Sequence, residues 1–75
     1  MYVYCGEDDW NYLVDTNTEK VYEISIDENG EVYKYQKHQQ NMQNFLRWHP
    51  YLEVYKETSE KPEWLKKNNS VTELI

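Results

Sequence analysis

Carboxylates are the side chains with the most obvious chemical potential in this sequence, because acids crowd its first half. Three of them follow one another in the stretch "CGEDDW", residues 5–10, between a thiol and an indole. Grouped carboxylates can coordinate a cation, exchange protons with a substrate or present negative charge to a partner. The residues around them decide among these three chemistries.

A cation site is not predicted. The stretch that starts at Asp15 begins like an EF-hand loop, but Lys20 stands where that loop needs Gly. Its twelfth position is Ile26, which cannot supply the bidentate carboxylate. His38 and His49 would lie roughly 16 Å apart along a helix at ~1.5 Å per residue, so they cannot share a zinc ion.

Catalysis is not predicted either. Cys5 is the only cysteine, and the acids at 7–9 disfavour the thiolate that a nucleophile needs. We expect it to be a small buried residue at a strand end. No base or nucleophile accompanies the carboxylates, and 75 residues are too few to enclose a deep cleft. The sequence therefore predicts a protein that is not an enzyme and that uses no cofactor or metal.

The charge is distributed unevenly along the chain. The formal net charge is −6, but residues 1–33 carry nine acids and one base, whereas residues 34–75 carry seven bases and five acids. An acidic half of this kind repels a phosphate backbone, which argues against direct nucleic-acid binding. It suits a basic protein surface instead, because opposite charges speed association. Along a predicted strand at 21–27, Glu23 and Asp27 share one face about 13 Å apart at ~3.3 Å per residue.

Length and composition predict one domain, 1–75, with a strand-rich acidic half at 1–36 and a helix-rich half at 37–75. A chain this short buries only about 60% of its unfolded surface, so eight Tyr, three Trp and one Phe cannot all be enclosed. Exposed Tyr and Trp favour interfaces, and we expect a homodimer with an aromatic contact. With no signal peptide and no apolar run of about 20 residues, the expected location is cytoplasmic, away from membranes.

Strands are predicted at 2–4, 10–15 and 21–27, with turns at 6–9 and 16–19. The second turn sets Asp15 opposite Lys20, a favourable cross-strand pair. After the third strand, Asn29-Gly30 suits a two-residue type I′ turn that starts a fourth strand. The cross-strand pairs of that hairpin would be Glu28–Glu31, Ile26–Tyr33, Ser25–Lys34, Ile24–Tyr35 and Glu23–Gln36.

An amphipathic helix is predicted at 38–49. Its apolar stripe consists of Met42, Phe45 and Leu46, it ends before Pro50, and His49 caps its end.

The rest of the chain gives a weaker pattern. Residues 51–57 fit either a strand or a helical turn. A short second helix follows, with Ser59 as N-cap and Lys66 and Lys67 in its last turn. The segment 70–75 is expected to be loose or to dock through Leu74 and Ile75. Strands followed by helices predict an α+β protein: an antiparallel meander of three to four strands, one amphipathic helix and a short C-terminal helix.

A small, acidic chain rich in Tyr and Asn, with no catalytic motif, resembles the host-takeover and counter-defence proteins of bacterial viruses. Within that group it is similar to the DNA mimics, whose acidic surfaces occupy the nucleic-acid groove of a host protein. The resemblance implies a basic DNA-binding host protein as the partner, for example a histone-like nucleoid protein, a polymerase subunit or a nuclease.

Two functions are therefore expected as alternatives. In the first, the chain is a non-enzymatic inhibitor that mimics DNA, with Trp10 as an aromatic anchor beside the acids. In the second, it is an interaction module that works through exposed Tyr and Trp, and its acids serve only solubility. The residues predicted to bind the partner are Glu7, Asp8, Asp9, Trp10, Asp15, Glu19, Glu23, Asp27, Glu28 and Glu31.

Overall fold

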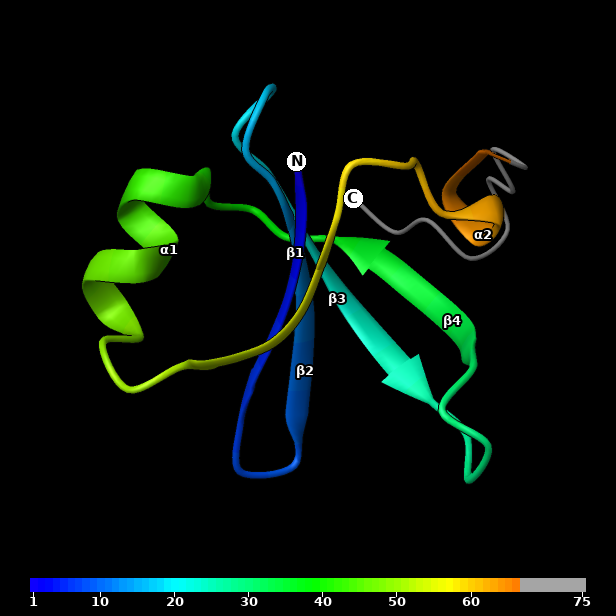
Figure 1. Ribbon diagram of the computed structural model, residues 1–75. Coiled ribbons are helices and arrows are strands. Elements are labelled where there is room, and N and C mark those ends of the chain that lie inside the picture. The colour runs from blue at the N-terminus through cyan, green and yellow to red at the C-terminus, as the bar shows by residue number, and fades with distance from the viewer. Residues whose placement is uncertain (67–75) are drawn as a thin grey trace.

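The computed structural model describes residues 1–66, and its main element is one five-stranded antiparallel sheet (Figure 1). The spatial order of the strands is β4-β3-β2-β1-β5, so the last strand lies beside the first. Two short helices complete the fold. The elements are β1 (Tyr2–Glu7), β2 (Trp10–Asp15), β3 (Lys20–Ile26), β4 (Val32–Lys37), α1 (Met42–Trp48), β5 (Glu53–Thr58) and α2 (Glu63–Lys66).

The α+β prediction is wrong, because the protein is mainly β. The sheet has five strands rather than three or four, and the helices contain seven and four residues. Residues 53–58 decide the difference, since they form β5 and pair with β1 instead of forming a helical turn. Within residues 1–66, no helix is long and apolar enough to cross a membrane.

Each face of the sheet carries its own apolar cluster, because successive side chains of a strand point to opposite faces. Neighbours along β1 illustrate this alternation: Tyr4 belongs to one cluster and Cys5 to the other. One helix closes each cluster. We refer to the two sides of the sheet as the α1 face and the α2 face.

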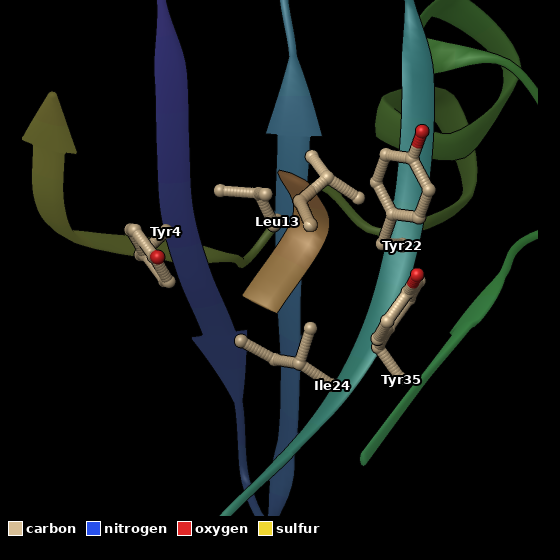
Figure 2. Close-up of a cluster of buried hydrophobic side chains, with 6 residues drawn as sticks. Tyr4, Leu13, Tyr22, Ile24 and Tyr35 are labelled. Atoms are coloured by element: carbon tan, nitrogen blue, oxygen red, sulfur yellow. The ribbon is translucent and has the colours of Figure 1, made fainter. Parts of the chain in front are cut away.

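The α2 face is built mainly from tyrosines. Figure 2 shows labelled side chains from four strands lying around α2, which crosses this face. The indole of Trp64 lies against the ring of Tyr35 at 5.0 Å between centroids, and its Nε1 donates to the hydroxyl of Tyr4 at 3.3 Å. Leu65 completes the contact of α2 with the sheet. The buried members of the cluster are Tyr4, Leu13, Tyr22, Ile24, Tyr35 and Leu65.

The α1 face is organised around Phe45, which is fully buried. Its ring meets the ring of Tyr12 edge-on at 4.7 Å between centroids, a favourable aromatic geometry. Met42 packs beside it from the first turn of α1. The buried members of this cluster are Cys5, Tyr12, Val14, Val21 and Phe45.

The β2–β3 turn has the predicted register, with Asp15 opposite Lys20. The carboxylate of Asp15 is buried, and its Oδ1 accepts hydrogen bonds from the backbone N–H groups of Asn17 at 3.0 Å and Thr18 at 3.4 Å. Glu19 closes the turn at a φ of 64°, a left-handed conformation that a non-glycine residue adopts at some cost. The turn is therefore held mainly by one aspartate side chain.

The β3–β4 hairpin keeps most of the predicted register with a different turn. Ile24 pairs with Tyr35 and Ser25 with Lys34 as expected, but Ile26 pairs with Val32. Tyr33 is consequently an extra residue on β4, and the predicted Ile26–Tyr33 and Glu28–Glu31 pairs are wrong.

The cause of this difference lies in Asp27. Its Oδ1 accepts the backbone N–H groups of Asn29 and Glu31, both at 2.9 Å, and its backbone pairs with Glu31. The loop therefore has three residues, with Gly30 at a φ of 81°. An Asx-type bond from the aspartate has displaced the two-residue turn that Asn29-Gly30 favours by itself.

Helix α1 begins four residues later than predicted. The backbone N–H of His38 donates to Val21, and that of Met42 donates to Glu19, so both groups extend contacts with β3. Asn41 then caps the helix by accepting the N–H of Asn44 at 3.0 Å. A helix that starts at residue 38 is not formed, because the N–H of Met42 that would bond to His38 in such a helix is bonded to Glu19 instead. The predicted capping of the other end by His49 is confirmed.

The second helix also begins later than predicted. It begins at Glu63, and the carbonyl of Pro62 accepts the N–H groups of Leu65 and Lys66, so Ser59 does not cap it. Lys66 lies in the last turn as expected. Lys67, and the expected docking of Leu74 and Ile75, lie outside the described residues.

The packing of Phe45 generates a stability prediction. Truncation by Phe45→Ala should lower the free energy of unfolding by about 3–5 kcal/mol, because it removes the ring that joins α1 to the sheet. Urea unfolding followed by circular dichroism measures the change. Gln43→Ala on the exposed side of α1 is the matched control, with an expected change of roughly 0.5 kcal/mol or less. Equal losses in the two variants would contradict this account of the α1 face.

Candidate functional site

The ten predicted partner-binding residues do not form one surface. Antiparallel strands place alternate turns at opposite ends of the sheet, so Asp15 and Glu19 in the β2–β3 turn lie away from the other acids (Figure 1). The β1–β2 and β3–β4 turns share the other end. We call that end the acidic end. Its turns contain Asp8, Asp9, Asp27, Glu28 and Glu31.

Four of the five carboxylates at the acidic end are free of internal partners. Within the described part of the chain, Asp8, Asp9, Glu28 and Glu31 are exposed, and their side chains make no ion pair and no hydrogen bond. Asp27 is the exception, since its Oδ1 holds the turn. Replacing these four carboxylates would therefore remove no hydrogen bond or ion pair from the described part of the fold.

The β1–β2 turn holds its two acids in an unusual backbone geometry. Glu7 pairs with Trp10, so the turn consists of Asp8 and Asp9 alone. Asp8 has a φ of 57°, a left-handed conformation that Gly, Asn and Asp adopt more readily than other residues. The turn therefore carries two adjacent negative charges on a backbone that suits an aspartate.

A shallow recess of about 260 Å³ lies over β2, β3 and β4 next to the acidic end. Trp10 and Tyr33 line it, and both are well exposed, at 57% and 64% of their surface. Asp9 and Glu23 line it as well, so aromatic and carboxylate groups face the same space. We call this feature the Trp10 recess. Its other lining residues are Asn11, Ile24, Ser25 and Ile26.

Two further acids near the recess are engaged within the protein. Oε1 of Glu23 accepts a hydrogen bond from Nε2 of Gln36 at 2.7 Å across the β3–β4 pair. Oε1 of Glu7 lies 3.3 Å from Nδ1 of His49 at the end of α1. These carboxylates are half-buried and stabilise the α1 face as well as adding charge to it.

The two histidines come together around Phe45, which the sequence did not indicate. His38 lies 5.2 Å and His49 4.7 Å from the Phe45 ring, centroid to centroid. Tyr12 contacts both, at 6.2 and 5.8 Å. Burial lowers the pKa of His38, the positive charge of His49 adds to that effect, and Glu23 opposes it. The sequence-based prediction put the two histidines far apart because it assigned His38 to the helix at 38–49.

Nδ1 of His38 has a defined role in this cluster. It accepts the backbone N–H of Gln40 at 3.1 Å, which requires that this nitrogen carry no proton. The imidazole is therefore neutral in the packed state, with its proton on Nε2. The same burial raises the pKa of Tyr12.

Cys5 is buried on the α1 face, and burial raises its thiol pKa to about 11. The sequence-based expectation of an unreactive thiol thus has a different cause, since desolvation rather than the neighbouring acids is responsible. Among residues 1–66, no three His, Cys, Asp or Glu side chains gather closely enough to hold a metal ion.

Sequence reasoning missed Tyr33 as a member of the site. It assigned Tyr33 to a pair with Ile26, whereas the extra residue on β4 leaves the ring exposed beside Trp10. The available signal was Asp27, because an aspartate two residues before Asn29 can accept the turn's N–H groups and lengthen the loop.

No family model, no curated protein and no solved structure shows a significant match to this chain. The site is therefore interpreted from its own residues.

The neutral state of His38 generates a pH prediction. Its folded pKa is lower than the unfolded value of 6.5, so the unfolded chain takes up the proton first as the pH falls. The contribution to stability is complete above about pH 6.5 and is lost as the pH decreases toward the folded pKa. His38→Asn keeps an acceptor for the N–H of Gln40 and removes the titration. The difference in unfolding free energy between parent and variant should shrink or reverse on acidification in a series of urea titrations. If the unfolding free energies of parent and variant changed in parallel with pH across this range, the conclusion that His38 is neutral in the folded protein would be refuted.

Proposed function

We propose that this chain binds a basic DNA-binding protein through its acidic end and inhibits that protein by occupying its nucleic-acid groove. The observation that carries the proposal is the Trp10 recess, where Trp10 and Tyr33 stand exposed beside Asp9 and Glu23. The four free carboxylates of the adjoining turns extend the same negative surface.

The recess suits one side chain of an arginine or lysine. A guanidinium or ammonium group is attracted to the face of an indole or phenol ring, and a carboxylate at its edge adds a charge-assisted hydrogen bond. Asp9 is free for this role, whereas Glu23 already accepts from Gln36 and contributes mainly charge. Grooves that bind nucleic acid are rich in such cations.

The charges around the recess favour a basic groove over an arbitrary surface. Five acids occupy two neighbouring turns, and Lys34, opposite Ser25, is the base closest along the hairpin. An array of this kind complements the positive potential that attracts DNA, and it raises the rate of association at low salt. Because the acids occupy turns of a sheet, their backbone positions do not depend on a bound partner.

The partner class follows from this chemistry, and a histone-like nucleoid protein is one candidate within it. Such a protein contacts phosphates through lysines and arginines, with little demand on base sequence. An inhibitor that offers carboxylates in place of phosphates needs no catalytic group of its own.

The first functional prediction compares two triple variants of equal net charge. D9N/E28Q/E31Q neutralises the acidic end and leaves Asp27 to hold the turn, whereas E57Q/E60Q/E63Q neutralises exposed acids of β5 and the α2 region. The first should weaken partner binding about tenfold, since each exposed contact contributes roughly 0.2–1 kcal/mol. The second should leave binding close to that of the parent.

Binding is measured by release of a fluorescent DNA duplex from a purified histone-like nucleoid protein, and by capture of proteins from a bacterial lysate at low and high salt. Circular dichroism controls for folding. The proposal predicts that captured proteins elute with salt and with duplex DNA. It fails if capture resists both, or if the two triple variants lose binding equally.

The role of Trp10 separates this proposal from an interface that uses aromatic contacts alone. Trp10→Ala should weaken binding by about 0.5–2 kcal/mol, the range for a cation over an aromatic ring, and leave the salt dependence intact. An interface based on aromatic packing would show a larger loss and little response to D9N/E28Q/E31Q. The salt series of Trp10→Ala distinguishes the two outcomes.

A further inference from the structure

A second surface of the protein lies between α1 and the β1–β5 side of the sheet. It is a groove of about 300 Å³ on the α1 face, and its lining is mostly apolar. Leu46 from α1 and Val54 from β5 form opposite parts of the lining, and each exposes about half of its surface. We call this feature the α1 groove. Its other lining residues are Val3, Cys5, Val14, Thr16, Met42, His49, Pro50 and Leu52.

Exposed apolar side chains concentrate around this groove. Leu46, Trp48, Tyr51 and Val54 are four of the eight large hydrophobic residues exposed in the described part of the chain, and they fall within nine consecutive positions. Trp48 and Tyr51 are exposed at 70% and 79%, directly next to lining residues in the sequence. Large apolar side chains exposed together in one segment of a small protein favour an interaction surface.

The segment that leads from α1 to β5 carries little negative charge. Residues 38–52 contain Arg47 and no acid, in a chain whose net charge is −6, although Glu7 contacts His49 of the groove and Glu53 follows the segment directly. Two copies of so acidic a chain repel each other at their acidic ends, and they meet with least repulsion where acids are sparse. Exposed Arg47 and Glu53 lie next to the apolar residues. A two-fold contact brings a patch against itself, so Arg47 of one copy can approach Glu53 of the other.

Strand β5 contributes one apolar residue to this surface. β5 is an edge strand that exposes Glu53, Lys56 and Glu57, and Val54 is its exposed apolar residue on the α1 face, since Tyr55 points to the α2 face. The β5 edge adjoins the α1 groove through Val54.

We propose that a second copy of this chain covers the α1 groove, forming a two-fold homodimer whose contact includes Leu46, Trp48, Tyr51 and Val54. The proposal does not depend on the function of the acidic end. Dimerisation and partner binding at the acidic end should respond to salt in opposite directions. Salt screens the repulsion between two acidic chains and strengthens apolar burial, so the dimer becomes tighter as salt rises.

Sedimentation equilibrium of the purified chain at low and high salt tests the proposal. The parent should be a dimer at micromolar concentration, with a dissociation constant that decreases as salt increases. Leu46→Glu and Val54→Glu should each raise that constant at least tenfold, because each puts a carboxylate into the contact. Both positions are already half exposed, and circular dichroism checks that the variants remain folded.

Two controls make the result specific to the α1 groove. Tyr33→Ser removes an aromatic side chain of similar exposure at the acidic end and should leave the dissociation constant unchanged. D9N/E28Q/E31Q should dimerise at least as tightly as the parent, even if it fails to bind a DNA-binding protein. A parent that remains monomeric at every salt concentration overturns the proposal, as does a dimer that tolerates both glutamate substitutions.

Discussion

β1 pairs with β2 on one edge and with β5 on the other, so the first strand of the chain joins its immediate neighbour to a segment some fifty residues away. This double pairing places β5 in the plane of the sheet. The chain runs from α1 on one face of the sheet, through the edge strand β5, to α2 on the opposite face. As a result, α1 covers one face and α2 covers the other. The helices stay short because the strands take most of the residues that a small chain has available.

Closure of both faces explains why the acids lie where they do. The α1 face and the α2 face bury tyrosines, aliphatic residues and Phe45, which leaves turns and edges for charge. Two consecutive antiparallel hairpins bring alternate turns to one end, so acids that are twenty positions apart in the sequence become neighbours. The apolar groove lies between α1 and β5, and its lining residue His49 contacts Glu7, which flanks the Asp8–Asp9 turn. The charged turns and the apolar groove are thus adjoining features of one small sheet.

Local patterns predicted the parts of the fold that local interactions determine. β2 was predicted with its observed limits, and the Asp15–Lys20 pair follows from a turn of four residues. β5 could not be assigned from its own residues, because its choice between strand and helix depends on β1, which is distant in the sequence. The start of α1 was predicted wrongly for a similar reason, since the N–H groups of His38 and Met42 bond to Val21 of β3 and to Glu19 of the turn before it.

The candidate site was predictable in composition and less so in arrangement. The acids of both hairpin turns and Trp10 were recognisable as a charged surface with an aromatic anchor. The sequence did not show that the carboxylates of Asp15 and Asp27 accept hydrogen bonds from backbone N–H groups, or that Glu23 accepts one from Gln36. Such bonds depend on turn geometry and strand register, which a charge count does not contain.

The β3–β4 hairpin has one further property, which concerns chain length. Eight residues, 26–33, join Ser25 to Lys34, and the observed three-residue loop with Tyr33 as an extra residue uses all of them. A two-residue turn at Asn29-Gly30 with no extra residue would use the same eight. The two loop conformations use the same number of residues between Ser25 and Lys34. A change from one to the other would therefore leave the Ser25–Lys34 pair in place. Substitutions in the tip can therefore change the partner of Ile26 and the direction of the Tyr33 ring while the Ser25–Lys34, Ile24–Tyr35 and Glu23–Gln36 pairs stay in register.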